Sequence, residues 1–151
     1  MASSIAVAQD HDFVAEATAL SGEQVELGRL ALDRSGSEDV RRFARQMVDD
    51  HAKAGDGLRA LPRVGTRPAP TTGREAGVRA RLTTLAGRDF DRAYMDRVVA
   101  VLRDTIALYE REQQAGSDAK ARQFASDTLT VLQGQWKIAL SAQGAARQQA
   151  P

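Results

Sequence analysis

The 151-residue chain contains no cysteine, and aromatic residues make up only 5% of it. The lack of cysteine excludes disulfides, thiolate zinc sites, iron–sulfur ligation and a cysteine nucleophile. Because aromatic residues are so few, leucine, valine and alanine must fill the interior, and such a core suits close-packed helices. No apolar run approaches the roughly 20 residues of a transmembrane helix. We therefore expect one domain without a membrane span.

Net charge is also nearly absent, since 21 basic and 20 acidic residues leave +1. No overall field therefore draws the chain to nucleic acid or to membranes. Arginine is nevertheless concentrated in residues 58–88, where Arg63, Arg67 and Arg74 are candidate anion-binding residues. A solvated linker is the simpler interpretation of this segment. It lacks the aromatic side chains that stack on bases, so we expect no specific nucleic-acid partner.

Apolar residues at helical spacing predict four long helices, over residues 12–34, 36–60, 89–115 and 118–143. Ser35 with Glu38 resembles a capping box for the second helix, and Ser117 is the expected cap of the last. A shorter helix is predicted over residues 72–85, within a long crossover. We therefore predict an all-α fold, an antiparallel four-helix bundle of ferritin-like layout. The domain spans 12–143, with flexible tails at 1–11 and 144–151.

His51 is one of only two histidines, and it falls on the apolar stripe of the second predicted helix. Asp49 and Asp50 precede it and are expected to face solvent, because adjacent helical residues point about 100° apart. The Glu-x-x-His pairs of di-iron bundles are missing. We interpret His51 as a hydrogen-bonded core residue, with a metal ligand as the alternative. No catalytic or dinucleotide motif is present, so the sequence favours a protein that is not an enzyme.

Four stretches in order resemble a bacterial family of unknown function: FVAEATALSGEQVELGRLAL, VRRFARQMVDDHAKAGDGL, FDRAYMDRVVAVLRDTIALYE and ARQFASDTLTVLQGQWKIA. The resemblance implies a ferritin-like bundle with inward polar positions at Gln24, His51, Leu102 and Gln135. The family pattern has one glutamate and three histidines there, and only His51 is kept. We therefore expect a degenerate site without metal or other cofactor, in which Gln24 and Gln135 are partners of His51. Replacing His51 by leucine should then cost about 1–3 kcal/mol.

The expected function is a non-catalytic structural or interaction role in the bacterial envelope. Two alternatives stay open: a metal-binding or redox protein with a reduced site around His51, and an anion or envelope-surface binder acting through the arginine-rich crossover. The resemblance implies a periplasmic or exported protein, although the opening MASSIAVAQD is not an intact signal peptide. The sequence identifies neither a substrate nor a partner, and a homodimer stays open.

Overall fold

The computed structural model of the chain describes residues 3–62 and 73–149, with side chains described for 13–62 and 76–149. All regular secondary structure in these ranges is helical, which confirms the all-α prediction. The helices are α1 (Ser3–Arg34), α2 (Glu38–Arg59), α3 (Gly73–Thr83), α4 (Gly87–Ala115) and α5 (Ala119–Gln148). Within the described ranges, no helix is long and apolar enough to cross a membrane.

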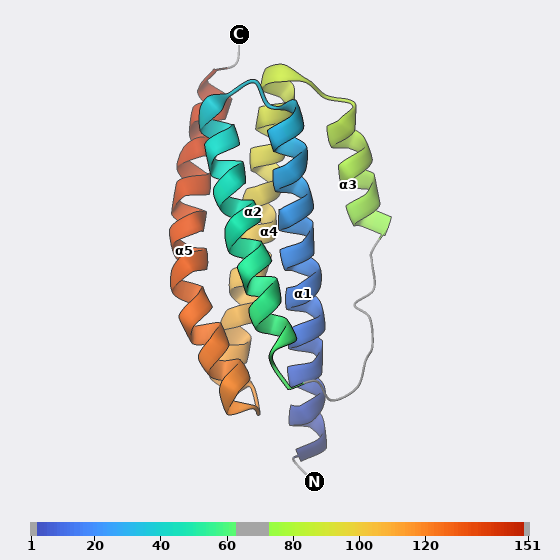
Figure 1. Cartoon of the computed structure of the whole chain (residues 1–151), viewed down its shortest axis with the longest axis vertical. Coiled ribbons are helices and arrows are strands. Elements are labelled where there is room, and N and C mark those ends of the chain that lie inside the picture. The colour runs from blue at the N-terminus through green and yellow to red at the C-terminus, as the bar shows by residue number, and fades with distance from the viewer. Residues whose placement is uncertain (1–2, 63–72, 150–151) are drawn as a thin grey trace.

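The four long helices lie side by side in a bundle (Figure 1). α1 and α2 run in opposite directions, as do α4 and α5, whereas α2 and α4 run in the same direction because the long crossover returns the chain to the end where α2 begins. α1 packs closely on α2, α4 packs closely on α5, and α1 lies against α4, whereas α2 and α5 approach each other much less. α3 lies outside the four, beside α1, and Arg79 of α3 pairs with Glu26 of α1 at 2.7 Å. The bundle is therefore two helix pairs joined mainly through α1 and α4.

The core runs the length of the bundle and is built largely from leucine, valine, alanine and methionine. The few aromatic residues are concentrated in it. The rings of Phe13 and Tyr109 meet edge to face at 5.1 Å, and those of Phe90 and Tyr94 stack at 6.0 Å. Aromatic pairs of this kind add to the free energy gained by burying their area. The first pair joins α1 to the C-terminal part of α4, and the second lies within the first turns of α4.

The first and last helices, α1 and α5, are longer than the sequence pattern indicated. α1 begins at Ser3 rather than near residue 12, and α5 continues to Gln148. Residues 144–148, expected in a flexible tail, are therefore helical. Two alanines in this stretch favour the helix, and Arg147 holds it to Asp96 of α4 at 3.0 Å. Apolar periodicity fades there because the contacts are polar.

Two predicted helix caps are wrong. Ser37, not Ser35, caps α2 and accepts a hydrogen bond from the Val40 amide. The Ser35 hydroxyl instead donates to the buried Asp91 carboxylate of α4 at 2.5 Å, a contact that joins distant parts of the chain. Likewise Asp118, not Ser117, caps α5. In both cases a second suitable cap lies within two residues, and sequence alone does not choose between them.

Candidate functional site

The four positions that the family resemblance singled out are all buried, one on each long helix. Gln24 of α1 is 1% exposed, His51 of α2 and Gln135 of α5 are each 3% exposed, and Leu102 of α4 is fully buried. Polar side chains are seldom buried to this degree. We refer to Gln24, His51 and Gln135 as the central polar residues.

Contacts between the helices place the central polar residues at one level of the bundle. Gly28 lies against Ala44 and Val48 of α2, and because α1 and α2 are antiparallel, Gln24 lies one turn further, beside His51. Gln135 is joined directly to Asp50, the neighbour of His51, because its amide donates to the Asp50 carboxylate at 2.9 Å.

Leu102 lies close to the same level. Two side-chain contacts between α4 and α5 bracket it, Asp96 with Gln143 and Gln113 with Ser126. Since α4 and α5 are antiparallel, these contacts put Leu102 within about one turn of Gln135. The structure therefore brings the four positions together.

Most of the hydrogen-bonding capacity of these groups is unused. Both amide atoms of Gln24, both ring nitrogens of His51 and the carbonyl oxygen of Gln135 are buried without a hydrogen-bond partner of normal geometry. Each such group carries a desolvation penalty of about 1–3 kcal/mol. The central polar residues are thus a costly feature of an otherwise apolar core.

His51 is uncharged at neutral pH. Burial lowers its pKa from 6.5 to about 4, and the Asp50 charge and the nearby Gln135 amide offset only part of this effect. A buried imidazolium would lose its hydration without gaining a close ion pair. His51 therefore offers one donor and one lone pair to its surroundings.

The donor set does not fit a transition-metal site. Structural zinc takes four nitrogen, sulfur or carboxylate ligands and catalytic zinc takes three. Here the layer supplies one imidazole, two amides that bring no charge, and Leu102, which has no donor atom. The neighbouring carboxylates are engaged, since Asp50 already accepts from Gln135 and Glu23 pairs with Arg97. In the described part of the chain, no group of three or more histidine, cysteine, aspartate or glutamate side chains is arranged to hold a metal ion.

Asp50 is the residue that sequence reasoning placed incorrectly. It was expected to face solvent, but it is half-buried and points toward α5, whereas Asp49 is exposed as expected. The helical spacing already puts Asp50 at the edge of the α2 apolar stripe. What the sequence could not supply was the position of α5 beside that edge.

The side chains of the candidate anion-binding arginines lie outside the part of the chain that the structure describes. Arg63 and Arg67 lie in the crossover, outside the described residues, and the side chain of Arg74 is outside them as well.

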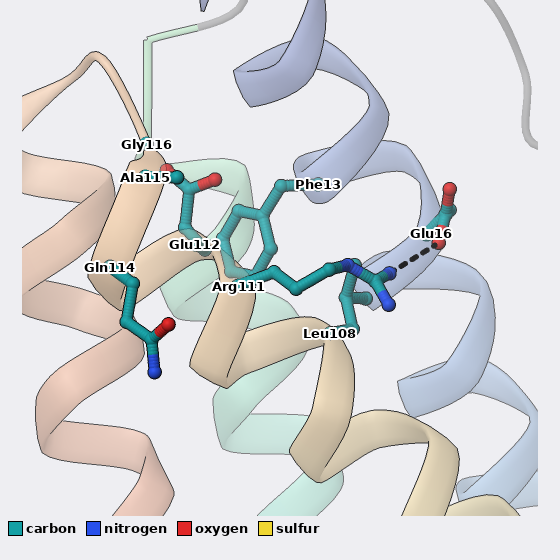
Figure 2. Close-up of a pocket in the computed structure, with 8 residues that line it drawn as sticks. All are labelled: Phe13, Glu16, Leu108, Arg111, Glu112, Gln114, Ala115 and Gly116. Carbon is teal, nitrogen blue, oxygen red and sulfur yellow. Dashed lines mark ion pairs between the residues drawn. The ribbon is translucent and has the colours of Figure 1, made fainter.

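A cavity that the sequence did not indicate lies at the C-terminal end of α4, and its volume is about 330 Å³. Figure 2 shows its lining: Phe13 of α1 faces the last turns of α4, and the Glu112 carboxylate lies beside Gly116. Arg111 extends from α4 toward α1 and pairs with Glu16 at 3.9 Å. Nothing in the linear pattern marks this site, because its walls come from residues about 100 positions apart.

Comparison with known proteins assigns the chain to a family. The model of the domain of unknown function DUF4142 matches residues 1–141, which include α1 to α4 and most of α5. The chain therefore belongs to the DUF4142 family. No curated protein and no solved structure matches the chain.

Proposed function

We propose that this protein is a ferritin-like bundle that has no working metal site and acts without catalysis, through contacts made by its surface. The observation that carries the first half is the neutral character of the central polar residues. An amide has no charge to offset the cost of dehydrating a divalent ion, and one imidazole is too few ligands. The bacterial envelope is the location that the family resemblance supports.

Metal titration of protein purified without an affinity tag tests the absence of a metal site. We expect no stoichiometric binding of Zn²⁺, Mn²⁺ or Fe²⁺ by calorimetry at pH 7. The matched controls are His51→Ala and His11→Ala, which remove the two histidines one at a time. Binding of one ion that is lost in His51→Ala but kept in His11→Ala would establish the alternative, a reduced metal site that still works.

The surface of α5 supports the second half of the proposal. We define the outer stripe of α5 as its exposed residues Val131, Gly134, Ile138, Ser141 and Ala145. Their alternating spacing of three and four residues is that of a helix–helix seam, and none is charged. Val131 and Ile138 are each 48% exposed, as much as any large apolar residue described. A surface helix normally places such a stripe against a partner.

A second copy of the chain fits this stripe. In an antiparallel pair of α5 helices centred on Gly134, Val131 of one copy meets the partner's Ile138, and the reverse contact follows by symmetry. Gly134 has nothing within 4 Å of where its Cβ would be, so the second helix can approach closely there. In this pairing only residues 131–138 of the two stripes overlap, about 10 Å of helix, which indicates a small interface and a weak dimer.

Sedimentation velocity over a concentration series tests the dimer. We expect self-association at high protein concentration, and its loss in Ile138→Lys. Leu140→Lys is the matched control, because Leu140 is also exposed, at 39%, but lies on another side of α5. A protein that stays monomeric at every concentration, or two variants that behave alike, would refute the role of the stripe.

A further inference from the structure

The cavity between α1 and the end of α4 has the size of a small-molecule site. Its volume of about 330 Å³ is within the usual range of roughly 300–1,000 Å³. It is distinct from the central polar residues and from the outer stripe of α5. It is also built on two long helices rather than on loops, so its walls are held by the packing of the bundle.

One part of the cavity wall is apolar and firmly held. Phe13 is 2% exposed and Leu108 is 5% exposed, and the Phe13 ring packs edge to face on Tyr109. These side chains cannot hydrogen-bond a ligand. They favour a ligand that brings an apolar group of modest size.

The rest of the wall is biased toward negative charge. Glu112 is buried at 4% exposed, and Glu16 lines the cavity from α1, on the other side of Phe13 (Figure 2). The carbonyl groups that end α4 add partial negative charge, and α4 has no basic residue in its last turn. Among the described lining residues Arg111 is the single cation, but its side chain is 68% exposed and turned toward Glu16. The described part of the lining therefore carries a net charge of −1.

Gly116 lets the Glu112 carboxylate lie against the end of the helix. A Cβ at residue 116 would collide with that carboxylate and with the Glu112 carbonyl oxygen. The backbone of Gly116 is extended, a conformation that any residue can adopt. The requirement for glycine is therefore the space that Glu112 occupies, and a methyl group there would displace the carboxylate.

From these features we propose that the cavity binds a small organic cation, a primary ammonium that carries a short apolar group. The ammonium lies beside Glu112 and the terminal carbonyls of α4, and the apolar group lies against Phe13 and Leu108. A carboxylate or phosphate ligand would meet the Glu112 carboxylate and the negative end of a helix. A neutral ligand of the same shape would use only the apolar wall.

Benzylammonium is a suitable probe, with benzyl alcohol and benzoate as its neutral and anionic counterparts. We expect titrations followed by ¹H–¹⁵N NMR to shift the amide signals at the end of α4. Benzylammonium should bind at least about tenfold more tightly than benzyl alcohol, because a single partly buried charge pair exceeds that difference. Benzoate should bind most weakly. Equal affinity for the three probes, or no shift at the end of α4, would overturn the proposal.

Substitutions test whether the preference for benzylammonium depends on the residues named above. Glu112→Gln should weaken benzylammonium binding about tenfold and leave benzyl alcohol unchanged, whereas Glu110→Gln, at an exposed position on the same helix, should change neither. Should Glu112→Gln fail to fold, Gly116→Ala keeps the test, because a Cβ at residue 116 would displace the Glu112 carboxylate without removing it. This variant should also weaken binding, with Gly22→Ala as the control that meets no neighbour. Unchanged binding in both Glu112→Gln and Gly116→Ala would refute the site.

Discussion

The α1–α4 side of the bundle and the α2–α5 side are held by different chemistry. Between α1 and α4, Arg97 and Glu23 form an ion pair at 2.6 Å, with only 17% and 10% of their side chains exposed. Between α2 and α5, the neutral Gln135 amide donates to the half-buried Asp50 carboxylate at 2.9 Å. Removing one partner of the first contact leaves a charge away from water. Removing one partner of the second leaves a carboxylate that water can reach, so the two sides should differ in sensitivity.

The largest effect is expected at the ion pair. Arg97→Met keeps the apolar stem of the side chain but removes its charge. We expect the free energy of unfolding to fall by about 3–5 kcal/mol, because the largely buried Glu23 carboxylate loses its cation. Urea denaturation at pH 7 measures this change.

Arg103→Met is the matched control for that variant. Arg103 lies on the same helix, its side chain is 69% exposed, and it meets Asp104 at 3.4 Å. Its loss should change stability by less than about 0.5 kcal/mol. Similar losses in the two variants would mean that burial does not strengthen the α1–α4 contact.

The second-largest effect is expected in the pH dependence of stability, and it comes from His51, which lies beside the α2–α5 contact. Its pKa is lowered to about 4 in the folded protein, whereas the unfolded chain takes up a proton near pH 6.5. Between these values the unfolded state binds more protons, so stability falls as the pH falls. The loss should reach about 3 kcal/mol at pH 4 and should vanish above pH 7.

His51→Leu isolates this contribution. The unfolding free energy of the variant should lack the part of the pH dependence that comes from His51. Any contribution from His11 cancels in the difference between the two proteins, because both contain it. At pH 7 we expect the variant to be more stable by about 1 kcal/mol, since both His51 nitrogens are buried without a hydrogen bond of normal geometry. This reverses the sign expected from the sequence, which assumed that His51 was paired. A difference in unfolding free energy that stays constant from pH 7 to 4.5 would contradict the burial of a neutral imidazole.

The helical fold was predictable because each long helix buries one regular stripe. In α2, for example, Val40, Ala44, Met47 and His51 repeat at the helical spacing, and all four are buried. The helix ends were less predictable. Ser35 has the residue type of a cap, yet a long-range bond to Asp91 decides its role. Local patterns therefore identify which residues face inward but not which distant group each polar residue meets.

The site was predictable only in part, for the same reason. The stripes place Gln24, His51 and Gln135 inside, since each occupies an inward position on its helix. Their lack of hydrogen bonds depends on distances between helices, which periodicity does not determine. The cavity at Glu112 depends on Phe13 arriving from the other end of the chain. A contact of that kind leaves no trace in either segment alone.

The smallest expected effect compares two glycine-to-alanine changes and tests how firmly the α2–α5 side is packed. Gly22 of α1 has nothing within 4 Å of its missing Cβ, so Gly22→Ala should raise stability by about 0.5–1 kcal/mol through helix propensity alone. Gly57→Ala in α2 brings the same gain in helix propensity, but the new Cβ would lie 2.5 Å from a ring carbon of Phe124 on α5. Phe124 is half-buried and can move outward, at a cost that should offset most of the gain. We therefore expect Gly57→Ala to change the free energy of unfolding by less than about 0.5 kcal/mol. A loss of several kcal/mol would show that Phe124 is fixed, and that the α2–α5 side is as rigid as the side held by Arg97 and Glu23.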